Sequence, residues 1–118
     1  MRRLLWVENH NQFVRMSGRF LVGYGVTVVP SVAAARTAIE SGRFDVILLD
    51  HDLDDGPGVT LLDSLRGLVN RPPVVACSAH ADGNAALLAA GADAACPKAE
   101  FATVGAVLAA VVGRRGSP

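Results

Sequence analysis

The chain has 118 residues, the usual size of one domain, and 51% of them are hydrophobic, so it can bury a core and is not intrinsically disordered. Its eleven basic residues balance eleven acidic ones, at a formal net charge of zero. This balance gives no electrostatic basis for direct binding to nucleic acid or to an anionic membrane.

Short apolar runs alternate with amphipathic stretches along the whole chain. Each run has about five residues, is bounded by Gly, Pro, Asn or Asp, and shows little polar alternation. This pattern is typical of parallel strands that are buried on both faces. In chain order, we expect strands over residues 3–7, 26–29, 45–49, 73–78 and 94–96.

The stretches between these runs have apolar residues at helical spacing. The first helix should end near Gly23 and Gly25, and the second should begin after Ser31, a good N-cap, and end at Gly42. The fourth is rich in alanine and only weakly amphipathic. We expect the fourth helix over residues 85–90. The residues that we expect on the buried faces of the other four helices are Phe13, Met16 and Phe20; Val32, Ala35 and Ile39; Leu61, Leu62, Leu65 and Leu68; and Phe101, Val104, Leu108, Val111 and Val112.

The regular strand–helix alternation predicts an α/β fold, a doubly wound five-stranded parallel sheet with helices on both faces. Such sheets carry their functional groups in the loops after the carboxyl ends of the strands. All three histidines, most of the clustered acids and the only lysine fall in those loops. The side chains concerned are Glu8, Asn9 and His10; Asp50, His51, Asp52, Asp54 and Asp55; Ser78 and His80; and Lys98.

These residues predict phosphoryl-transfer chemistry. Converging carboxylates favour a divalent cation, and oxygen ligands select a hard ion such as Mg2+. Asp50 would be both a metal ligand and the nucleophile toward phosphorus. Lys98 would hold one phosphoryl oxygen as a point charge, and the Ser78 hydroxyl would donate a hydrogen bond to another. Asp54 and Asp55, beside Gly56 and Pro57, are expected to form a turn rather than to bind metal.

Three segments resemble the receiver domains of two-component response regulators (CheY-like). They are the apolar run 46–49 ending at Asp50 with Gly58 eight residues on, the segment 74–79 around Ser78, and the segment 91–94 leading to Lys98. The resemblance covers the chain in order and implies a flavodoxin-like sheet of strand order 2-1-3-4-5.

The resemblance also implies a function. Asp50 would accept a phosphoryl group from a histidine kinase or phosphotransfer protein, with Mg2+ held by Glu8, Asn9, Asp50 and Asp52. The chain would be a signalling domain rather than an enzyme, and would act by binding a downstream protein effector. Asp52 and His80 occupy positions that tune how fast water removes the phosphate.

Three departures from the family pattern stand out, and two of them, Asn9 and Ala95, favour an alternative, a pseudo-receiver that binds partners without being phosphorylated. Asn9 stands where receivers usually carry the acid that contacts the metal, which costs attraction of roughly 1–4 kcal/mol. Lys98 lies between Pro97 and Ala99, whereas proline commonly follows this lysine. Ala95 stands where an aromatic ring often moves during switching, so any output must take another route.

Other interpretations rest on single features. Asp50-His51-Asp52 resembles the Asp-x-Asp motif of haloacid-dehalogenase-type phosphatases, but that motif normally follows the first strand. The three histidines lack metal-ligand spacing with one another. The last helix is uncharged over residues 101–113 and could support a homodimer through its outer face, which carries Ala106, Val107 and Ala110.

Two observations bear on location. The apolar run after Arg3 reaches only to Val7 and is too short for a signal peptide, and residues 101–113 are too few to span a bilayer. We therefore expect a soluble, cytoplasmic protein with a single domain over residues 1–118. Cys77 and Cys96 are too few for a disulfide framework, and we expect both to be buried.

Overall fold

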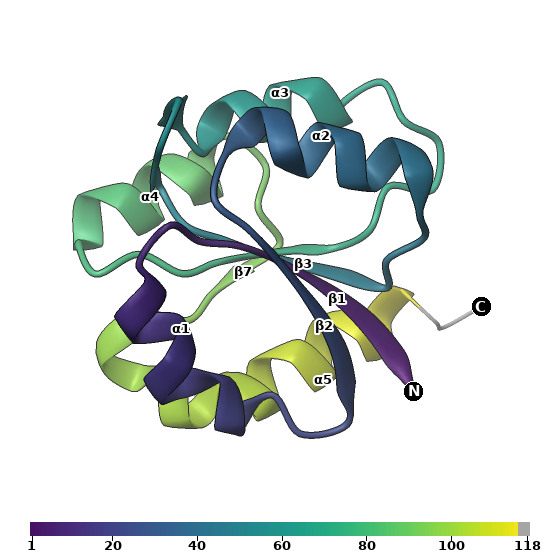
Figure 1. The fold of residues 1–118 in the computed structure, drawn as a ribbon. Coiled ribbons are helices and arrows are strands. Elements are labelled where there is room, and N and C mark those ends of the chain that lie inside the picture. The colour runs from purple at the N-terminus through teal and green to yellow at the C-terminus, as the bar shows by residue number, and fades with distance from the viewer. Residues whose placement is uncertain (116–118) are drawn as a thin grey trace.

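The computed structural model describes residues 1–115, which contain a five-stranded parallel sheet of order β2-β1-β3-β6-β7 (Figure 1). A separate antiparallel hairpin, β4 with β5, follows β3 in the chain. Since this hairpin lies outside the sheet, the order is the expected 2-1-3-4-5 arrangement, and the predicted fold class is confirmed. The strands are β1 (Arg2–Val7), β2 (Tyr24–Val29), β3 (Val46–Leu49), β4 (Asp52–Leu53), β5 (Gly56–Pro57), β6 (Val74–Ala76) and β7 (Ala94–Ala95).

Helices cover both faces of the sheet. The α-helices are α1 (Asn11–Ser17), α2 (Val32–Ser41), α3 (Val59–Leu65), α4 (Ala81–Ala89) and α5 (Val104–Arg115). Figure 1 shows α1 and α5 on one side of the sheet, with α2 and α3 on the other. Short 3-10 turns, Gly18–Phe20 and Lys98–Thr103, follow α1 and precede α5. None of the helices in the described part of the chain has the length and apolar character that a membrane crossing requires.

Side-chain alternation along the strands divides the core into two layers. Leu4 and Trp6 of β1 pack in the layer under α1 and α5, whereas Leu5 and Val7 pack in the layer under α2, α3 and α4. β1, β3 and β6 are buried on both faces, as the unbroken apolar runs predict. Cys77 and Cys96 are buried free thiols, which confirms that expectation.

The second apolar run is an exception, because full burial was expected there. β2 is an edge strand, and Val26 and Val28 remain 39% and 43% exposed. A cavity between β2 and α1, lined by Val14, Arg15 and Val28 among others, shows that α1 covers this edge incompletely. The sequence pattern reports apolar character but does not show which strand ends the sheet.

Three helical expectations also need correction. Met16 is 62% exposed rather than buried, because the regular helix ends at Ser17 and a 3-10 turn, with three residues per turn, carries Phe20 to the core. Leu68 is 47% exposed, because α3 ends at Leu65. α4 begins at Ala81, four residues earlier than expected. The predicted start of α2 is confirmed, since the Ser31 hydroxyl accepts a hydrogen bond from the Ala34 amide at 3.0 Å.

Candidate functional site

The predicted lysine–carboxylate pair forms at the carboxyl edge of the sheet. Lys98 Nζ donates hydrogen bonds to Glu8 Oε2 at 3.0 Å and to Asp50 Oδ2 at 3.2 Å. These residues follow β7, β1 and β3, and they are distant in sequence. The side chains of Glu8, Asp50 and Lys98 are 0%, 7% and 14% exposed, so the ammonium compensates two nearly buried carboxylates.

Backbone contacts fix the orientation of Asp50. Its amide donates to Val7 O at 3.0 Å, which ties the end of β3 to the end of β1. Its Oδ1 accepts a hydrogen bond from the His51 amide at 2.8 Å. Gly58, at the start of α3, packs directly against the Asp50 carbonyl oxygen, and its amide donates to His51 O at 2.6 Å. The hairpin β4–β5 therefore closes tightly behind the aspartate.

The pKa shifts of Glu8 and Lys98 follow from their burial and from their proximity to Asp50 and to each other. Burial and the nearby Asp50 carboxylate raise the pKa of Glu8 from 4.5 to about 7, against the opposing effect of Lys98. Burial alone would lower the pKa of Lys98, but hydrogen bonding and attraction to Glu8 and Asp50 outweigh it and raise that pKa. Lys98 therefore stays a cation at neutral pH, as a phosphoryl-oxygen ligand must.

This arrangement predicts a pH-dependent stability. The folded protein holds the Glu8 proton more tightly than the unfolded chain does. In a metal-free buffer that contains a chelator, we therefore expect the Glu8 contribution to the free energy of unfolding to be fully present below pH 4.5 and to be lost as the pH rises through about 7. The loss is on the order of 1–3 kcal/mol. Urea titrations across this window measure it, and Glu8→Gln should flatten the slope. Parallel pH curves for the two proteins would contradict this assignment.

Ser78 lies beside the same edge in a fixed loop. It is 1% exposed, and its carbonyl oxygen accepts a hydrogen bond from the Lys98 amide at 3.1 Å. The Asn84 side chain clamps its backbone, accepting from the Ser78 amide at 2.9 Å and donating to its carbonyl at 3.2 Å. The Ser78 hydroxyl accepts from the His80 amide at 3.1 Å. Asn84 was not among the residues singled out from the sequence, because a polar residue in an alanine-rich helix carries no signal of its partner.

The side chains of the other two predicted metal ligands, Asn9 and Asp52, contact residues outside the group formed by Glu8, Asp50 and Lys98. Asn9 Nδ2 donates to Asp54 Oδ1 at 3.1 Å. The Asp52 side chain is 75% exposed and lies 3.0 Å from His51 Nδ1. Asp54 and Asp55 form the hairpin turn, as expected, and Asp55 accepts hydrogen bonds from the Val32 and Ala33 amides at the start of α2. These bonds lower the pKa of Asp55.

The donor set fits a hard divalent cation in part. Glu8 Oε1 is buried without a hydrogen-bond partner, although its neighbour Oε2 accepts from Lys98 and from the His10 amide. An orphaned carboxylate oxygen beside a second carboxylate is a suitable ligand for Mg2+. Within residues 1–115, no group of three or more His, Cys, Asp or Glu side chains is placed to hold a metal ion. A magnesium ion here would thus need amide, carbonyl or water oxygens as well.

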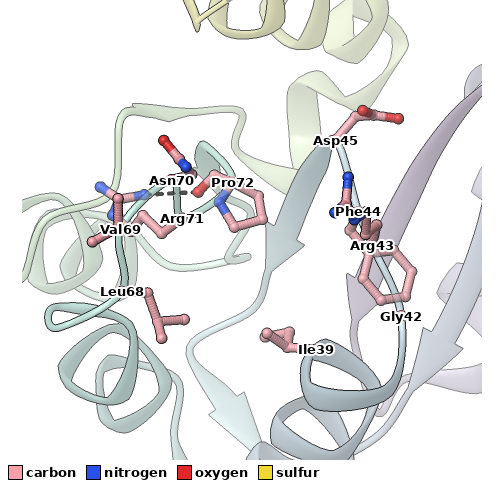
Figure 2. Close-up of a pocket in the computed structure, with 10 residues that line it drawn as sticks. All are labelled: Ile39, Gly42, Arg43, Phe44, Asp45, Leu68, Val69, Asn70, Arg71 and Pro72. Carbon is pink, nitrogen blue, oxygen red and sulfur yellow. Dashed lines mark hydrogen bonds between the residues drawn. The ribbon is translucent and has the colours of Figure 1, made fainter.

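The molecule also has a cavity of about 510 Å³ at the opposite edge of the sheet. Figure 2 shows its lining, which comes from the ends of α2 and α3 and the segments leading into β3 and β6. Arg71 there contacts Asp93, Gly91 O and Pro72 O. None of the predicted site residues lines this cavity, so it is separate from the lysine–carboxylate pair.

Comparisons with known structures agree with this fold. A structure of a CheY-like receiver domain protein from Methanospirillum hungatei has a TM-score of 0.85 at 21% identity, covering 98% of this chain and 96% of that one. The receiver domain of a sensor histidine kinase from Pseudomonas aeruginosa, solved with a magnesium ion coordinated in its active-site cleft, has a TM-score of 0.85 at 26% identity, covering 95% and 98%.

Sequence comparison leads to the same family. The transcription factor SKN7 of Candida albicans is 29% identical over 83 residues, which are 69% of this chain and only 15% of that protein. The response regulator receiver domain family matches residues 4–102, which include Glu8, Asp50, Ser78 and Lys98. The chain therefore belongs to the receiver domain family of two-component signalling.

Proposed function

We propose that the chain is a phosphoacceptor whose reactive group is the Asp50 carboxylate. A carboxylate oxygen of Asp50 attacks the phosphorus of a phosphohistidine donor, the phosphorus–nitrogen bond breaks, and an acyl phosphate forms. The observation that carries the proposal is the Lys98 ammonium, 3.2 Å from Asp50 Oδ2. From this position it would bind an oxygen of the incoming phosphoryl group, and Ser78 is the proposed hydroxyl donor to another.

The proposed metal is Mg2+, held by Glu8 and Asp50 with Asn9 and Asp52 at its margin. When bound, the ion would offset negative charge on the phosphoryl oxygens. The unpartnered Glu8 Oε1 supports this assignment, as does the magnesium ion in the Pseudomonas aeruginosa relative. Asp52 would contribute through its backbone carbonyl, because its side chain points toward His51.

The proposed partners are a sensor histidine kinase or phosphotransfer protein as donor and a downstream protein as effector. A cytoplasmic location is part of the proposal, and direct contact with nucleic acid is not, because the chain has no net positive charge. Ala106 and Ala110 are exposed on α5 and Val107 is half-buried. A homodimer through this face stays a prediction.

The proposal is tested by intact mass after incubation with acetyl phosphate, with Mg2+ or with a chelator. We expect a gain of one phosphoryl group only in the presence of Mg2+. The observation that favours the pseudo-receiver alternative is Asn9, whose amide occupies the acid position and bonds to Asp54. Failure to label under any Mg2+ concentration, with the fold intact, would favour that alternative.

Asn9→Asp is expected to strengthen Mg2+ binding roughly tenfold or more, because a carboxylate replaces an amide next to the proposed ligand Glu8 in the loop after β1. The hydrogen bond lost to Asp54 is exposed, so the fold should change little. Calorimetric titration with MgCl2 measures the affinity. Asn70→Asp is the matched control, since it adds the same charge beside the cavity at the opposite edge. Equal affinities in the two variants would exclude position 9 from the metal site.

A further inference from the structure

The Lys98 ammonium has a third neighbour besides its two carboxylates. Its Nζ lies over the Phe13 ring, 4.8 Å from the centroid. A cation at this distance is attracted by the electron-rich ring face, and the attraction grows as water is excluded. Because the Lys98 side chain is only 14% exposed, this contact is largely shielded from solvent.

Other aromatic rings hold Phe13 in place. Its ring packs edge-to-face on Phe101, with centroids 5.1 Å apart, and on Trp6 at 5.9 Å. Trp6 and Phe101 stack on each other at 5.5 Å. Phe101 belongs to the same 3-10 turn as Lys98, and Trp6 lies on β1, two residues before Glu8. The ring under the ammonium is therefore anchored to two of the segments that carry the site.

We propose that Phe13 is a positioning residue for Lys98. The lysine side chain has four flexible methylene groups, and each carboxylate fixes it from one direction only. The ring face closes a third direction, so the ammonium is held between Glu8 and Asp50 before a phosphoryl group arrives. This inference rests on the proposed function for its effect on phosphorylation, but the contact itself can be tested without that function.

The chain offers a direct probe, since Lys98 is its only lysine. In protein labelled with 15N-lysine, the Nζ group gives one side-chain NH3+ signal. In Phe13→Leu, its proton resonance should move downfield, because the shielding of the ring face is lost. Phe13→Tyr should retain the wild-type position. Phe20→Leu is the matched control, because Phe20 also packs on Phe101 but its cation contact is with Arg19.

The functional readout is the rate of labelling by acetyl phosphate. Phe13→Leu should slow it roughly three- to tenfold, whereas Phe13→Tyr and Phe20→Leu should stay close to wild type. An unmoved Nζ signal in Phe13→Leu, or equal slowing by the two leucine variants, would overturn the proposal.

Two further results are possible: the Phe13→Leu variant does not fold, or the wild-type protein is not phosphorylated. If Phe13→Leu does not fold, the contact is tested in the wild-type protein. Nuclear Overhauser contacts between the Lys98 Cε protons and the Phe13 ring are then expected, and their absence overturns the inference. If wild-type protein takes up no phosphoryl group, the proposed function fails, and the Nζ signal alone decides whether Phe13 positions Lys98.

Discussion

Asp50→Asn is expected to reduce phosphoryl incorporation from acetyl phosphate to background. A neutral amide oxygen is a much weaker nucleophile than a carboxylate, so the substitution removes the attacking group while keeping the shape of the side chain. The fold should persist, because an amide oxygen can still accept from the His51 amide. Intact mass spectrometry after incubation with Mg2+ and acetyl phosphate measures the loss of the phosphoryl adduct.

Asp52→Asn is the matched control for this experiment. Asp52 lies two residues further along the chain, at the start of β4, but its side chain is 75% exposed and contacts His51. We expect labelling of this variant to continue, with a change confined to the lifetime of the adduct. Full labelling of Asp50→Asn, or its loss in Asp52→Asn alone, would assign the nucleophile to another residue. The second outcome would revive the phosphatase-like interpretation of residues 50–52.

The sheet and the position of the site could be predicted from the sequence because both depend on local patterns. An apolar run such as residues 46–49 can be buried only between two covering layers, and parallel strands bring their carboxyl ends to one edge. Asp50 follows such a run directly, and Lys98 lies two residues after the last run, residues 94–96. Their convergence thus followed from topology alone, without any knowledge of side-chain geometry.

The parts that could not be predicted depend on contacts between distant side chains. The exposure of Met16 depends on where α1 ends, and the role of Asn84 depends on the loop that it clamps. Phe13 was expected only as a core residue. Its contact with Lys98 joins two segments 85 positions apart in the chain and has no signature in either of them. Such contacts depend on the tertiary packing of side chains, which cannot be read from a single sequence.

Asn9 shows how a local departure can be weighed by its surroundings. Asn9 follows Glu8 in the loop after β1 and its side chain is neutral, so the Lys98 ammonium compensates the Glu8 and Asp50 carboxylates without a third acid at position 9. The substitution therefore weakens attraction for a divalent cation while relieving repulsion in the protein without metal. The lysine–carboxylate pair is complete without the missing acid, which is why we favour phosphorylation over the pseudo-receiver alternative.

Gly58→Ala is expected to destabilise the fold by about 1–3 kcal/mol or more, because a Cβ atom there would overlap the carbonyl oxygen of Asp50. Backbone φ is −59° at this position, so alanine would be tolerated there if space were available. The atom that must move is backbone, at the end of β3, and it cannot rotate away as a flexible side chain could. Urea denaturation measures the free energy of unfolding.

Gly105→Ala is the matched control, since nothing lies within 4 Å of a Cβ atom at that position on α5. Alanine should stabilise this helix by about 0.5–1 kcal/mol, so the two substitutions are expected to have opposite signs. Gly58→Ala should also slow labelling of Asp50, because relief of the overlap displaces the residue that carries the nucleophile. If Gly58→Ala were as stable as Gly105→Ala, the close packing of α3 against the end of β3 would be wrong, and the backbone position assigned to Asp50 would be wrong with it.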